Sequence, residues 1–104
     1  MPTLRTGLVV GGAYAAKVRK TLFAQIRGSA KGKVLKEEPS DEEIVRAAGE
    51  LNRVLYEVLV DRVRIEKGDV VRVSVNYAVE EGRIRWDLET LSIQAWRRIP
   101  EQDI

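Results

Sequence analysis

The stretch Asp69–Glu89, with the sequence DVVRVSVNYAVEEGRIRWDLE, contains the strongest structural pattern in this chain. Its first half alternates between apolar and polar residues: Val71 and Val73 fall on one side of the pattern, Arg72 and Ser74 on the other. A period of two predicts a β-strand that buries one face and exposes the other. The stretch therefore predicts a sheet with one buried side, which other parts of the chain must cover.

A β-hairpin follows from the same stretch. The Glu-Gly pair at positions 81–82 is a tight-turn signal between two alternating runs. A two-residue turn places Tyr77 opposite Trp86 and Val79 opposite Ile84, so the apolar sides of the two strands fall on the same face. The turn length and the apolar pattern agree, and together they predict the register of the hairpin.

The flanking sequence predicts two more strands and two helices. Leu4–Val10 and Leu91–Arg98 have strand-like patterns. Residues 13–28 fit a helix with apolar residues at every third or fourth position. A second helix begins after Ser40, whose Ser-Asp-Glu-Glu sequence is a capping box, and ends near Asp61. We therefore expect an α+β fold: an antiparallel sheet of about four strands with two helices packed on one face.

Length and composition set further limits. A chain of 104 residues fits a single domain over residues 1–104. Hydrophobic residues make up 44% and charged residues 33%, which is typical of a globular protein. No apolar run approaches the length of a membrane span and the first residues lack a signal-peptide pattern, so we expect a cytoplasmic protein without membrane contact. Many charged residues and few amides are typical of thermophilic proteins.

The sequence contains no Cys and no His. This excludes thiolate nucleophiles, zinc–thiolate sites, imidazole bases and imidazole metal ligands. The acidic residues at positions 37–43 are more typical of a solvated helix start than of a metal site. An enzyme would have to use carboxylates, lysines or hydroxyls alone, so the composition favours a function in binding, and we expect no metal and no cofactor.

Charge is distributed very unevenly along the chain. Residues 1–36 contain eight basic residues and no acidic one, for a net charge of +8. The remaining residues contain the other ten basic residues and all 16 acidic ones, for a net charge of −6, which reproduces the overall +2. Such asymmetry favours a polyanionic partner. The alternative is that the acidic helix neutralises the basic one within the fold.

The candidate contacts for a polyanion are of two kinds. Basic side chains of the first strand, the first helix and the loop after it would bind phosphates: Arg5, Lys17, Lys20, Arg27, Lys31 and Lys33. The outward side of the sheet would add guanidinium groups and an aromatic ring, from Arg72, Arg85, Arg98 and Trp96. A ring that stacks on a base, beside Arg side chains that bind phosphates, is typical of single-stranded nucleic-acid recognition.

These assignments have alternatives. Trp96 could pack at a subunit contact, since exposed aromatic residues often mark interfaces. Asp87 and Glu89 on the same side of the sheet could pair with its arginines. If Trp96 does not stack on a base, Tyr14 near the start of the first helix is the next aromatic residue beside the basic ones, and we include it among the candidates.

Three segments resemble the archaeal ThermoDBP-type single-stranded DNA-binding proteins and their relatives. They are TLRTGLVVGGAYAAKVRKTLFAQI (Thr3–Ile26), KGDVVRVSVNY (Lys67–Tyr77) and IRWDLETLSI (Ile84–Ile93). The resemblance covers nearly the whole chain. It implies an α/β DNA-binding domain unlike the OB-fold, sequence-tolerant binding of single strands in a basic and apolar cleft, and no enzymatic activity. Some members carry a C-terminal leucine zipper, whereas this sequence has no heptads after its last strand.

The sequence thus predicts a non-enzymatic protein that binds single-stranded DNA with little sequence preference. Two alternatives stay open. One is an RNA-binding accessory protein that uses the same chemistry, and the other is a protein–protein adaptor whose basic helix docks an acidic partner. We also expect a homo-oligomer, a dimer or a tetramer, because coating a strand favours multivalent contact.

Overall fold

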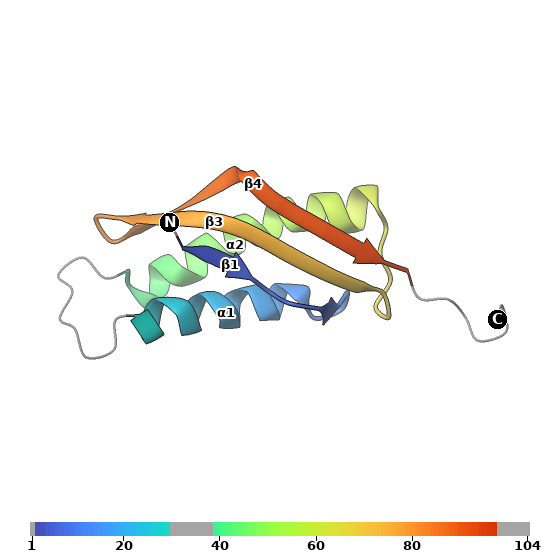
Figure 1. Ribbon diagram of the computed structural model, residues 1–104, viewed down its shortest axis with the longest axis horizontal. Coiled ribbons are helices and arrows are strands. Elements are labelled where there is room, and N and C mark those ends of the chain that lie inside the picture. Colours follow the sequence, from blue (N-terminus) through green and yellow to red (C-terminus); the bar gives the residue numbers. More distant parts are fainter. Residues whose placement is uncertain (1, 30–38, 98–104) are drawn as a thin grey trace, which may run out of the picture.

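The computed structural model describes residues 2–29 and 39–97. In chain order its elements are β1 (Thr3–Arg5), β2 (Val9–Val10), α1 (Tyr14–Ser29), α2 (Asp41–Tyr56), η1 (Glu57–Arg62), β3 (Val70–Glu80) and β4 (Arg83–Trp96). The strands form one antiparallel sheet in which β3 pairs with β1, β2 and β4. Figure 1 shows this sheet lying along the two helices. The α+β class expected from the sequence is confirmed.

The alternating pattern of β3, the central strand, has the predicted effect. Val71, Val73 and Val75 are fully buried, while the residues between them lie outside the core. Tyr77 pairs with Trp86, so the predicted hairpin register is confirmed. Since β3 pairs with every other strand, its burial pattern defines both faces of the sheet: an inner face toward the helices and an outer face away from them.

The N-terminal strand, expected as one continuous element, is divided into β1 and β2. β1 pairs through Arg5↔Ser74 and β2 through Val9↔Val71, so four steps along the N-terminal segment face three along β3. The extra residue makes a β-bulge. Gly7 lies in it with a φ of 66°, a left-handed conformation that favours glycine.

Thr6 restores the hydrogen bonding that this bulge would interrupt. Its backbone N–H donates to the Val73 carbonyl at 3.0 Å, and its Oγ1 accepts the Val73 N–H at 3.0 Å. The bulge also changes which residues face inward, because an odd insertion reverses the alternation. Leu4 is therefore fully buried, whereas Val10, six positions later, is 50% exposed.

β4 is a single strand where two strands were expected. Its register with β3 shifts between the pairs Ser74↔Ser92 and Asn76↔Asp87. Between these pairs the chain advances five residues along β4 but only two along β3. Thr90 closes this larger bulge: its Oγ1 accepts the Asn76 N–H at 2.8 Å and donates to the Asp87 carbonyl at 2.7 Å. The strand bends sharply near its label in Figure 1. The three extra residues of β4 again reverse the alternation. Even-numbered residues of β4 such as Ile84 point inward before the bulge, and odd-numbered ones such as Ile93 point inward after it.

Both helices follow the predicted amphipathic pattern. The apolar residues that they bury are Tyr14, Val18, Leu22 and Ile26 of α1 and Ile44, Ala47, Ala48, Leu51 and Leu55 of α2. The Glu43 N–H donates to Ser40 Oγ at 3.1 Å, as the capping box predicted. The π-helical turn η1 continues α2 to Arg62, close to the predicted helix end. In the part of the chain that the structure describes, neither helix is long and apolar enough to cross a membrane.

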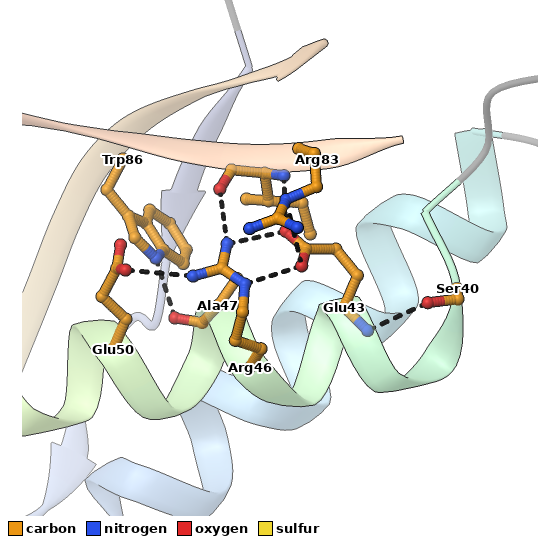
Figure 2. Close-up of polar contacts among 8 residues, drawn as sticks. Ser40, Glu43, Arg46, Ala47, Glu50, Arg83 and Trp86 are labelled. Atoms are coloured by element: carbon orange, nitrogen blue, oxygen red, sulfur yellow. Dashed lines mark hydrogen bonds and ion pairs between the residues drawn. The ribbon is translucent and has the colours of Figure 1, made fainter. Parts of the chain in front are cut away.

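A buried carboxylate joins α2 to the β3–β4 hairpin (Figure 2). Glu43 is only 8% exposed and accepts hydrogen bonds from Arg46 Nε at 2.6 Å, from Arg46 Nη2 at 2.7 Å and from the Ile84 N–H at 2.8 Å. Arg46 also donates to the Ile84 carbonyl and to Glu50, both at 3.0 Å, and Arg83 Nε lies 3.7 Å from Glu43. The hydrogen bonds from Arg46 are the main cause that lowers the pKa of Glu43 from 4.5 to about 2.

Two aromatic side chains extend this connection across the protein. Trp86 Nε1 donates to the Ala47 carbonyl on α2 at 2.8 Å, and its ring meets Tyr77 edge-on with ring centroids 5.4 Å apart. The Tyr77 hydroxyl donates to Gln25 Oε1 on α1 at 2.9 Å, and Gln25 Nε2 donates to the Thr3 carbonyl on β1 at 3.0 Å. One series of contacts therefore links α2, β4, β3, α1 and β1.

We predict that Glu43→Gln destabilises the protein in a pH-dependent way. At pH 7 the free energy of unfolding should fall by about 2–4 kcal/mol, because Arg46 loses its buried ionic partner. The folded pKa of Glu43, about 2, lies below its ordinary value of 4.5. The stabilisation that the ionised carboxylate gives the parent protein is therefore fully present above about pH 4.5 and is lost as the pH falls toward 2. Urea unfolding of both proteins between pH 7 and pH 2.5 measures the difference.

The matched control is Glu50→Gln, which changes the exposed carboxylate bonded to the same Arg46. This variant should lose less than about 1 kcal/mol at any pH. Equal losses in the two variants would contradict the structural role of Glu43.

Candidate nucleic-acid interface

Three rows of side chains cross the outer face of the sheet, and the strand register defines them. The first row is Arg5, Ser74 and Ser92; the second is Arg72 and Gln94, with Gly7 at the β1 end; the third is Val10, Val70 and Trp96. We call these the outer rows. None of their members is acidic. At about 3.3 Å per residue, the four steps from Ser74 to Val70 span roughly 13 Å.

A depression of about 220 Å³, which we call the sheet hollow, opens on the first two rows. Its lining residues are Arg5, Gly7, Arg72, Val73, Ser74, Ser92 and Gln94. The bulge between β1 and β2 explains the space. Gly7 has no side chain to fill it, and a Cβ built on Gly7 would meet no atom within 4 Å.

Trp96 presents a partly exposed ring next to the sheet hollow. Its exposed fraction is 44%, and the guanidinium carbon of Arg72 lies 5.5 Å from the ring centroid, within the range of a cation–π contact. The guanidinium is also bonded to Gln94, whose Oε1 accepts from Arg72 Nε at 2.8 Å. Arg72 is thus held between an amide and an aromatic ring, in an ordered position on the protein surface.

A second basic surface lies on α1. Lys17 and Lys20 are exposed and line a shallow depression together with Thr21, Ala24 and Gln25. Gln25 donates to the Thr3 carbonyl of β1, the strand that carries Arg5, so this depression borders the β1 edge of the sheet. In the described part of the chain, neither lysine forms an ion pair.

Two other predicted contacts are engaged within the protein. Arg27 forms an ion pair with Asp41 and donates to the Pro39 carbonyl at 3.1 Å, so it joins the end of α1 to the start of α2. Arg85 lies on the outer face beyond the β4 bulge, 4.0 Å from Glu80. The alternative that the acidic helix neutralises the basic one therefore applies to Arg27, whereas Arg85 forms only an exposed contact within the sheet.

Tyr14 lies in the core and not beside the basic residues on the surface. It is 8% exposed, because it falls on the same side of α1 as Val18, and burial raises the pKa of its hydroxyl. Its ring cannot serve as a stacking platform in this conformation. Lys31, Lys33 and Arg98 lie outside the described residues.

The sheet hollow itself does not follow from the sequence patterns. The alternation of Leu91–Arg98 predicts Ser92 and Gln94 on the outer face, but the pattern of Leu4–Val10 predicts an unbroken strand with no space beside it. Gly7 was the available signal, since a glycine within a strand pattern often marks a bulge or a close backbone approach.

Comparison with known proteins gives consistent matches. The sequence profile of the ThermoDBP-related family of archaea matches residues 4–85. The crystal structure of apeThermo-DBP-RP2 bound to ssDNA dT10 is 47% identical in sequence, with a TM-score of 0.89, over 100% of this chain and 46% of that chain. The crystal structure of pfuThermo-DBP-RP1 is 39% identical, with a TM-score of 0.81, over 98% of this chain and 63% of that chain. This chain therefore spans less than two thirds of either relative. No functionally curated protein matches it.

We predict that Arg72 shields the ring of Trp96 in the free protein. Arg72→Ala should increase the quenching of tryptophan fluorescence by acrylamide, because the ring loses the group that covers it. Stability should change by less than about 1 kcal/mol, as expected for an exposed cation–π contact. Lys20→Ala, on the exposed side of α1, is the control and should not change the quenching. An Arg72→Ala protein with unaltered quenching would contradict the contact.

Proposed function

This chain belongs to the ThermoDBP-related family of archaea, and we propose that it binds single-stranded DNA along the outer rows of its sheet. The resemblance found in the sequence is confirmed by the family profile and by both relatives. The observation that carries the proposal is the Arg72–Trp96 pair beside the sheet hollow, with Arg5 on the same face. The relative apeThermo-DBP-RP2 is bound to ssDNA dT10 in its crystal structure, which supports this choice of ligand.

The chemistry of the outer rows suits a flexible strand better than a duplex. The Trp96 ring offers a platform on which any base can stack, because every base has an aromatic face. The guanidinium groups of Arg5 and Arg72 bind phosphates or base edges, and Ser74 and Ser92 add hydroxyl groups that both donate and accept hydrogen bonds. Stacking of this kind requires bases that are not already stacked in a helix.

The lysines of α1 extend the proposed interface around one edge of the sheet. Lys17 and Lys20 border β1, so a strand that leaves the outer rows across this edge meets two further positive charges. Such contacts follow the phosphate backbone and carry no sequence information. We therefore propose binding that is largely independent of sequence and involves no chemical reaction. The dimer or tetramer and the cytoplasmic location remain predictions from the sequence.

A competition experiment tests the ligand class. We expect fluorescently labelled ten-residue DNA strands of mixed sequence to bind, and unlabelled single strands to displace them at least about tenfold more effectively than duplex of the same sequence. Fluorescence anisotropy at moderate salt measures both. RNA of the same sequence serves as a further competitor, and stronger competition by RNA would favour the RNA-binding alternative. The absence of binding to any of these nucleic acids would reject the proposal.

The two parts of the interface should respond differently to mutation. Lys17→Ala or Lys20→Ala should make the slope of log affinity against log salt shallower by about 0.7, since each removes one phosphate contact. Trp96→Ala should weaken binding by about 1–3 kcal/mol with little change in this slope, because stacking releases no counterions. Anisotropy titrations at several salt concentrations measure both quantities.

Arg62→Ala is the control for the lysine variants. Arg62 lies on η1 and pairs with Glu57 at 3.6 Å, so its loss should alter neither affinity nor slope. Melting temperatures establish that each variant remains folded. A folded Trp96→Ala protein that binds as tightly as the parent would show that bases stack elsewhere.

A further inference from the structure

We propose that the sheet hollow receives one base of the bound strand and prefers a base whose major-groove edge carries a keto oxygen, O6 of guanine or O4 of thymine, with guanine preferred most strongly. The inference rests on the proposed function, since it concerns a single position within a bound single strand. It is compatible with binding that tolerates most sequences, because the remaining bases only stack or contact solvent. One position with a preference would set the register of the strand on the protein.

The size of the hollow fits a base. Its volume is about 220 Å³. A single phosphate group would leave most of this space unfilled. The lining also allows a flat ring to approach the strands, because Gly7 has no side chain and the side chains of Ser74 and Ser92 are short.

The polar groups around the hollow are mainly hydrogen-bond donors. The guanidinium groups of Arg5 and Arg72 donate and cannot accept. Gln94 Oε1 already accepts from Arg72 Nε at 2.8 Å, which leaves the Gln94 amide nitrogen to donate. None of the lining residues carries a carboxylate. Donors of this kind complement the keto oxygens of guanine and thymine and do not complement the amino groups of adenine and cytosine.

Three backbone groups at the bulge are already hydrogen-bonded and do not compete for the base. The Val73 N–H and carbonyl both bond to Thr6, and the Gly7 carbonyl accepts from Thr6 Oγ1 at 2.8 Å. These three backbone groups are therefore occupied, and the guanidinium and amide donors at the rim are side-chain groups. This assigns the selection of the base to Arg72 and its neighbours.

Arg72 is the residue best placed to select guanine. An arginine pairs bidentately with O6 and N7 of guanine, the commonest specific contact between proteins and bases. Gln94 and the ring of Trp96 hold the guanidinium in position before a strand binds, which reduces the entropy lost on binding. Trp96 lies one row further along the same face, where it can stack on the neighbouring base.

The test uses ten-residue deoxycytidine strands with one central substitution. A central guanine should raise affinity about tenfold over a central adenine, at the lower end of the range for a bidentate arginine contact. A central thymine should give a smaller gain. A central 7-deazaguanine, which lacks the N7 acceptor, should lose most of the gain from guanine. Anisotropy at fixed salt measures the four affinities on the unmodified protein.

Two variants assign the preference to the hollow. Arg72→Lys keeps the charge but loses the planar fork, and Ser92→Val fills part of the space with a residue that strands tolerate. Both should bind all four strands within about twofold of one another, the range expected when only stacking and phosphate contacts remain. Arg62→Lys is the matched control and should retain the guanine preference.

The outcomes separate the two proposals. If none of the four strands binds, the proposed function itself fails. If all four bind equally to the unmodified protein, single-strand binding stands and the base site is wrong. A guanine preference that persists in both Arg72→Lys and Ser92→Val would also overturn the assignment, because the base would then be selected elsewhere.

Discussion

The buried carboxylate of Glu43 connects the two layers of this protein, α2 and the β3–β4 hairpin, beside the apolar core. A two-stranded hairpin is at most marginally stable in water, so β3 and β4 need the helices for support. Burying a charge is costly unless it is fully paired, and Arg46 and the Ile84 N–H together satisfy this carboxylate. The ion pair therefore specifies how α2 lies on β4, and the contact between Trp86 and Ala47 follows from that placement.

Two bulges then determine which side chains reach the outer face. Each inserts an odd number of residues and so reverses the alternation of its strand. After the β4 bulge, Ser92, Gln94 and Trp96 face outward, next to the outward residues of β3. The bulge between β1 and β2 leaves an open space beside Arg72. The candidate interface thus results from irregularities of the sheet, in agreement with the frequent occurrence of bulges beside functional sites.

Local patterns in the sequence predicted much of the fold. The period of two in β3, the turn at positions 81–82 and the cap at Ser40 involve neighbouring residues, and each was confirmed. The interface was less predictable because it depends on long-range pairing. The ion pair between Arg27 and Asp41 and the contact between Arg72 and Trp96 join residues far apart in the chain. Helical spacing does predict the burial of Tyr14, since Tyr14, Val18, Leu22 and Ile26 lie four residues apart on one side of α1, and placing Tyr14 beside the basic residues of the surface was wrong.

The charge asymmetry of the sequence indicates a binding surface only when each basic residue is considered together with the acidic residues that it contacts. Basic residues bound to acidic ones, such as Arg27 and Arg46, hold the fold together and offer little to a polyanion. Within the described residues Arg5, Lys17 and Lys20 form no such pairs, and the structure places them on or beside the β1 edge. Net charge along a segment thus overestimates an interface, because it counts both kinds of residue. Of the basic groups without an acidic partner among the described residues, Arg5 and Arg72 line the sheet hollow, Lys17 and Lys20 border the β1 edge, and Arg19 lies apart from them beside α2.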